Sequence, residues 1–151
     1  MNKKLTISIT ALVAVFIVGI LYLGLYHNDY FGENKSLNTK VVSIIESEED
    51  KKLDFLSLNK NISFDWDEVY LIAPYEEVGT FFENRDTYVP KKTYTCEVDE
   101  VYMLAFTKYS EELGRNKVIE YTYIPIKYID CEKLRDREID GNYYYERDNS
   151  I

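Results

Sequence analysis

The first pattern in the chain is an unbroken apolar run near the N-terminus. Residues 5–26 read LTISITALVAVFIVGILYLGLY, 22 residues without a charge. A helix of that length crosses a hydrocarbon core about 30 Å thick. Lys3 and Lys4 precede the run, and acids follow it. Because flanking lysines stay in the cytoplasm, residues 1–26 are predicted to be a transmembrane anchor that leaves the rest of the chain outside.

A cleaved secretory signal is the alternative to an anchor. Its apolar region usually runs about 7–15 residues and ends in a small-x-small site. Here the run is longer, and its end offers only Tyr22-Leu23-Gly24, with a bulky residue where a small one is needed. A lipid anchor would need a cysteine at the end of the run, but the first cysteine is Cys96. We favour the uncleaved anchor.

Beyond the apolar run the composition becomes polar. Residues 27–40, HNDYFGENKSLNTK, are typical of a tether, so the folded domain is expected to span residues 41–151. Apolar residues at positions 41, 42, 44 and 45 predict a short amphipathic helix at the start of that domain.

Residues 68–73 are rich in β-forming side chains and stop before Pro74. Apolar side chains occupy both parities, which predicts a central strand covered on both faces. After the proline, Val78, Phe81 and Phe82 have helical spacing and predict a short helix.

Two further strands are predicted, at residues 98–107 and 117–126. Gly114 and Asn116 lie between them and favour a turn, so the strands should form an antiparallel hairpin. Pro125 indicates that the second strand lies at an edge or that its pairing stops there. Gly141-Asn142 predicts another turn before a short tyrosine-rich strand. The expected fold is therefore α+β, a transmembrane helix followed by a small domain with a mainly antiparallel sheet and a short helix.

One segment carries a recognisable motif, F-x-W-D-x-V-Y-x-x-x-P-Y. Its residues are Phe64, Trp66, Asp67, Val69, Tyr70, Pro74 and Tyr75. Over residues 62–128 the chain resembles a group of small uncharacterised bacterial membrane-anchored proteins and lipoproteins that carry this motif. It differs from the lipid-anchored members because it lacks the N-terminal cysteine. The resemblance implies an architecture and a location, and no activity.

The two cysteines are the sharpest geometric signal. A turn centred between Leu113 and Gly114 places Cys96 opposite Cys131 across the open end of the hairpin. An extracytoplasmic location permits oxidation, so a Cys96–Cys131 disulfide is predicted. The alternative is a pair of reduced thiols.

The acids around Trp66 offer a candidate carboxylate site. Asp65 and Asp67 share one face of an extended chain, with Glu68 beside them, but their spacing matches no EF-hand loop. We favour structural roles for these acids over a cation or hydrolytic site. Tyrosines at alternate positions, 121 with 123 and 143 with 145, suit either sheet packing or an exposed aromatic face, and we favour packing.

The composition of the chain argues against several classes of function. The chain has 18 basic and 27 acidic residues, a net charge of −9, which argues against nucleic-acid binding. One histidine and two cysteines do not supply a His/Cys zinc site, and no catalytic residue or cofactor motif is assigned. The expected partners are the lipid bilayer and an envelope protein or peptide. The leading hypothesis is a non-catalytic binding or accessory module at the cell surface; the alternatives are a membrane-tethered carboxylate-dependent hydrolase and a small acidic immunity-type protein.

Overall fold

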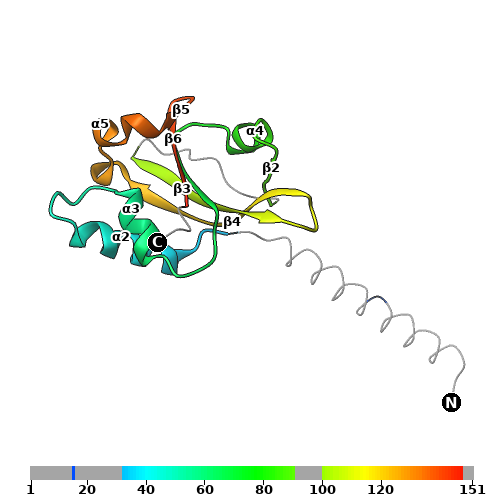
Figure 1. Ribbon diagram of the computed structural model, residues 1–151, viewed down its shortest axis with the longest axis horizontal. Helices are drawn as coiled ribbons and strands as arrows, with labels where there is room; N and C mark the ends of the chain where they lie inside the picture. The colour runs from blue at the N-terminus through cyan, green and yellow to red at the C-terminus, as the bar shows by residue number, and fades with distance from the viewer. Residues whose placement is uncertain (1–14, 16–31, 91–99, 148–151) are drawn as a thin grey trace, which may run out of the picture. The chain divides into compact units, whose positions relative to one another are not determined.

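The computed structural model describes residue 15, residues 32–90 and residues 100–147. The chain divides into two units, residues 1–31 and residues 32–151, and the second contains an α+β domain (Figure 1). The predicted anchor lies outside the described residues apart from Val15. Within those residues, no helix combines the length and apolar character that a membrane crossing requires. The anchor stays a prediction.

One six-stranded sheet organises the domain, in the order β2-β4-β3-β1-β6-β5. The strands are β1 (Glu68–Ile72), β2 (Thr87–Tyr88), β3 (Val101–Ser110), β4 (Arg115–Pro125), β5 (Glu138–Ile139) and β6 (Asn142–Glu146). Neighbouring strands are antiparallel except β2 and β4, which are parallel. β1 lies between β3 and β6, as expected for a central strand, and the mainly antiparallel α+β fold is confirmed.

The β3–β4 hairpin forms as predicted, but its register was predicted wrongly. Ser110 pairs with Arg115, so the loop holds four residues and is centred one residue earlier than expected. Gly114 closes it with φ of +65°, a conformation that suits glycine. A bulge between Phe106 and Thr107 then moves the pairing partway back, so that Phe106 pairs with Glu120, one residue short of the predicted partner. Pairing ends at Pro125, as the missing N–H of proline predicts.

Two helices cover one face of the sheet, α2 (Lys35–Ser47) and α3 (Phe55–Asn61) (Figure 1). α2 begins inside the segment expected to be a tether, because the Asn34 side chain accepts a hydrogen bond from the Leu37 N–H at 2.9 Å and caps the helix. The apolar core beneath these helices includes Val41, Ile45, Leu53, Leu58, Trp66, Val69, Leu71, Leu104 and Phe106.

The opposite face carries α4 (Val78–Glu83), the short helix predicted after Pro74. Val78, Phe81 and Phe82 are its buried residues. The ring of Tyr70, on β1, meets the two phenylalanine rings edge to face, at centroid distances of 5.7 and 5.3 Å. Aromatic packing therefore fixes α4 on this face.

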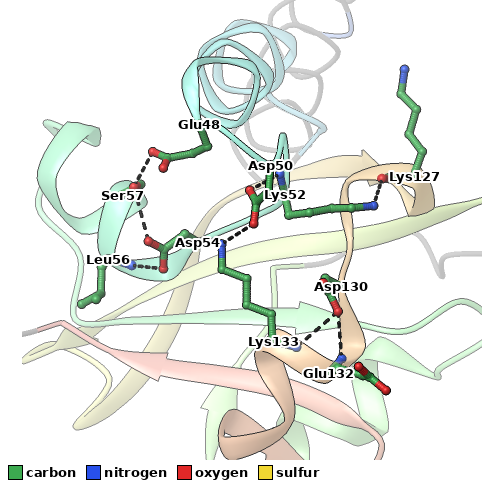
Figure 2. Close-up of polar contacts among 10 residues, drawn as sticks. All are labelled: Glu48, Asp50, Lys52, Asp54, Leu56, Ser57, Lys127, Asp130, Glu132 and Lys133. Carbon is green, nitrogen blue, oxygen red and sulfur yellow. Dashed lines mark hydrogen bonds and ion pairs between the residues drawn. The ribbon is translucent and has the colours of Figure 1, made fainter.

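The chain reaches its last hairpin through η1 (Ile126–Tyr128), α5 (Cys131–Leu134) and η2 (Arg135–Arg137). Figure 2 shows polar contacts between this segment and the loop before α3: the Lys52 Nζ donates to the Lys127 carbonyl at 2.6 Å, and Lys133 lies 3.1 Å from Asp50. The N–H of Leu53 also donates to a carbonyl of η1 at 2.8 Å. These contacts hold the start of α3 against the η1–α5 segment.

Candidate functional site

Trp66 and Val69 of the motif are core residues, and the partly buried Phe64 packs against the core. Trp66 is fully buried and meets Phe106 edge to face at 5.4 Å, while Phe64 meets the same ring at 5.1 Å. Val69 is buried on β1. The motif therefore anchors β1 to β3 and to the helical face of the domain.

The motif acids have separate structural partners. Asp67 accepts a hydrogen bond from the Tyr109 N–H at 2.8 Å. Asp65 binds Lys108, whose hydrogen bond holds the pKa of Asp65 below its usual range, and lies 3.8 Å from Arg147. The two carboxylates are tied to the chain's own groups, as the preferred structural reading expects. Among the described residues, no group of three or more His, Cys, Asp or Glu could hold a metal ion.

Glu68 points to the α4 face and gathers hydroxyl and amide donors. Its Oε2 accepts hydrogen bonds from Tyr70 Oη at 3.1 Å, Thr107 Oγ1 at 3.0 Å and Asn116 Nδ2 at 2.9 Å. Tyr144 Oη lies 3.5 Å from the other oxygen. Burial, then the negative charge of Glu68, raises the pKa of Tyr70, so the phenol stays a donor rather than becoming a base.

Pro74 and Tyr75 form the turn after β1. Tyr75 has φ of +64° and an exposed side chain, an uncommon backbone conformation for a bulky residue. The N–H of Glu76 donates to the Ala73 carbonyl at 3.4 Å and closes this turn. The motif's last two residues thus end the strand and turn the chain toward α4.

The predicted disulfide is not found at Cys131. This residue opens α5 and carries an exposed free thiol, while Cys96 lies outside the described residues. The prediction rested on a register that the four-residue loop overturns and that the bulge restores only in part. Moreover, the chain leaves the β3–β4 ladder at Pro125, so Cys131 is not part of that hairpin.

Sheet packing accounts for most of the alternating tyrosines. Tyr121, Tyr143 and Tyr145 are buried, and Tyr123 is partly buried. Tyr145 stacks on Phe55 of α3 with 5.7 Å between ring centroids. The structure confirms that packing, not an exposed aromatic face, is the main role of these residues.

A pocket that the sequence did not reveal lies beside this packed tyrosine. It has a volume of about 410 Å³, and we call it the arginine pocket. Its lining residues are Leu56, Arg137, Tyr145, Glu146 and Arg147. They come from α3, from η2, and from the end of β6 with the residue that follows it.

The two arginines of the pocket are positioned on aromatic rings. The guanidinium carbon of Arg147 lies 5.1 Å from the Trp66 ring centroid, and that of Arg137 lies 5.2 Å from the Tyr145 ring. Stacking of this kind orders the cation without neutralising it. Two cations and one acid line the pocket, in a chain whose net charge is −9.

Neither arginine is fully compensated by a carboxylate. Arg147 is 3.8 Å from Asp65, which is bound more closely by Lys108. Arg147 Nη1 also donates to the main-chain carbonyls of Phe64 and Trp66, at 3.4 Å each, which are uncharged acceptors. Arg137 makes no ion pair with any described residue. The pocket therefore presents guanidinium groups suited to a carboxylate or a similar planar anion.

A larger hollow of about 580 Å³ runs along α2, but all its described lining residues come from that helix and none is cationic. The arginine pocket is the better candidate because three elements build it and its charge opposes that of the chain. Comparisons with protein-family models, curated proteins and solved structures found no match. The candidate site thus rests on the geometry of this chain.

Proposed function

We propose that this chain is a non-catalytic binding or accessory module, held at the membrane by residues 5–26, which binds an anionic group of an envelope partner in the arginine pocket. The observation that supports it most directly is the pair of stacked guanidiniums in Arg137 and Arg147. A charge-assisted hydrogen bond to such a group contributes about 1.5–3 kcal/mol. Two guanidinium groups in one pocket are suited to a ligand that carries a carboxylate.

The alternative functions have less support in the described residues. A hydrolase would need carboxylates available to a substrate, whereas Asp65 and Asp67 are bound by Lys108 and by the Tyr109 N–H. An immunity-type protein would present acids to a basic partner, but the pocket presents cations. Binding of an anion is therefore the function that the geometry favours.

Binding can be followed through Trp66, because it is the single tryptophan of the sequence and lies against Arg147. The full-length protein in detergent micelles is titrated with the end-blocked peptide acetyl-Glu-Val-Glu-Val-Glu-amide. Its basic counterpart, with Lys in place of Glu, is titrated in parallel. The acidic peptide should give a saturable change in fluorescence, and the basic peptide should give none.

Substitutions of two arginines test whether the acidic peptide binds in the arginine pocket. Arg137→Gln should weaken binding of the acidic peptide at least 10-fold, which corresponds to about 1.4 kcal/mol. Arg135→Gln is the matched control, because Arg135 belongs to the same 3₁₀ helix but does not line the pocket. Equal losses in both variants, or equal binding of the two peptides, would overturn the proposed function.

A further inference from the structure

In the described part of the chain, the arginine pocket lies at the edge of the sheet where β6 extends beyond β5. The N–H of Arg147 donates to the Asp67 carbonyl at 2.7 Å, on the side facing β1. Because the N–H and C=O groups of successive residues in an antiparallel strand point to opposite sides, those of Glu146 point away from β1. On that side β5 pairs with β6 only at Asn142 and Tyr143. The main chain of Glu146 therefore faces the pocket side of the edge, beyond the last residue of β6 that pairs with β5.

The β4 side of the sheet, opposite β6, is covered by another segment of the chain. The N–H of Asn34 donates to the Tyr121 carbonyl at 3.0 Å, and Asn38 Nδ2 donates to the Tyr123 carbonyl at 2.6 Å. The segment that starts α2 thus covers main-chain groups of β4, which protects this edge from pairing with another chain. The end of β6 has no such cover in the described part of the molecule.

Taken with the proposed function, on which it rests, this geometry points to an acidic polypeptide segment that binds in extended conformation beside the end of β6. Main-chain hydrogen bonds to Glu146 supply part of the affinity, and an acidic side chain of the peptide reaches Arg137 and Arg147. Strand addition of this kind combines main-chain affinity with side-chain specificity.

The remaining pocket residues fit the same ligand. Leu56 is 49% exposed at the pocket wall and offers an apolar contact to a neighbouring side chain of the peptide. Alternate residues of a strand face the same side, so acids at every second position can meet the arginines. The Glu146 side chain lies 3.4 Å from the Tyr144 hydroxyl, which directs it toward its own strand.

N-methylation of the peptide separates strand addition from simple charge recognition. Two versions of acetyl-Glu-Val-Glu-Val-Glu-amide carry methyl groups on the main-chain nitrogens of either the glutamates or the valines. Only one set of N–H groups can face β6. We expect one version to bind the full-length protein at least 10-fold more weakly and the other to bind within about 3-fold of the parent.

A variant of the protein tests the proposed main-chain hydrogen bond between the peptide and the N–H of Glu146. Glu146→Pro removes the outward N–H, which is not used in pairing with β1, and proline is tolerated at edge strands. Glu146→Gln is the matched control, because it removes the charge and keeps the N–H. Binding should fall at least 5-fold in the proline variant and not in the glutamine variant, with thermal unfolding of both measured to confirm folding.

The outcomes distinguish the two proposals. Strand addition is supported if only one of the two methylated peptides binds more weakly and if binding of the parent peptide depends on Arg137. Strand addition is overturned if binding depends on Arg137, both methylated peptides bind like the parent, and free glutarate binds with the same affinity per carboxylate. In that case the proposed anion-binding function is retained. Binding that is independent of Arg137 overturns both. If Glu146→Pro does not fold, the two methylated peptides still decide the question on the unmodified protein.

Discussion

Neighbouring acids in the segment after Phe64 have different roles because the strand turns them to different surroundings. Asp67 accepts a main-chain hydrogen bond from Tyr109, whereas Glu68 gathers hydroxyl and amide groups on the α4 face. Trp66, between the two aspartates, is fully buried. Its indole N–H has no hydrogen-bond partner in the described structure, so ring packing is what stabilises this residue.

Tyr144 gives this region a pH dependence. Burial, followed by the charges of Glu68 and Glu146, raises the pKa of Tyr144 to about 12. The unfolded chain releases this proton near pH 10, while the folded protein retains it. The stability that neutral Tyr144 contributes is therefore complete below about pH 10 and is lost as the pH rises toward 12. In Tyr144→Phe, urea unfolding should show a shallower loss of stability between these pH values.

The matched control for that measurement is Tyr109→Phe, which removes a hydroxyl from a side chain that is 53% exposed. This variant should keep the alkaline slope of the unmodified protein. Identical slopes in the two variants would show that Tyr144 does not carry the predicted dependence. The slope does not vanish in Tyr144→Phe, because burial also raises the pKa of Tyr70 and Tyr143.

Among the elements, the turns decide how strands reach their neighbours. β5 and β6 are joined by Asp140 and Gly141, with φ of +49° and +74°, the pattern of a type I′ hairpin turn. β5 has only two residues because the chain before it forms η2, so among the described residues β5 pairs with β6 only at Asn142 and Tyr143. A longer β5 would cover the edge on which the arginine pocket lies.

Replacing Gly141 and Gly79 by alanine should change the free energy of unfolding in opposite directions. Gly141→Ala places a Cβ at positive φ and should lower the free energy of unfolding by about 1–2 kcal/mol. Gly79→Ala lies in α4, where nothing stands within 4 Å of an added Cβ, and should raise it by about 0.5–1 kcal/mol. Urea denaturation of both variants checks the signs. A loss of stability at Gly79 would contradict the helical environment described for α4.

At the scale of the whole molecule, the prediction concerns the N-terminal segment. The full-length protein should stay in the membrane fraction after a high-salt wash, and a variant lacking residues 1–26 should leave it. Added protease should digest residues 41–151 in intact cells, because Lys3 and Lys4 hold the N-terminus inside. A washed-off product that begins after residue 26 would show instead that the segment is a cleaved signal.

Local sequence patterns predicted several of the helices and strands. Apolar residues at both parities identified β1 as central, helical spacing identified α4, and turn residues identified the β3–β4 hairpin and the start of β6. These features depend on periodicity and on backbone preferences, which act within a few residues. The same local signals were too weak to show α3 and α5, which have seven and four residues and are stabilised by packing.

Tertiary structure decided the register and the candidate site. A bulge and a four-residue loop moved the β3–β4 pairing, since either change costs little locally and is selected by which side chains reach the core. Arg137 and Arg147 stand ten positions apart among many charged residues, and no spacing links them to Leu56 or Trp66. They line one pocket because α3, η2 and β6 come together around Tyr145, a long-range arrangement that no local pattern encodes.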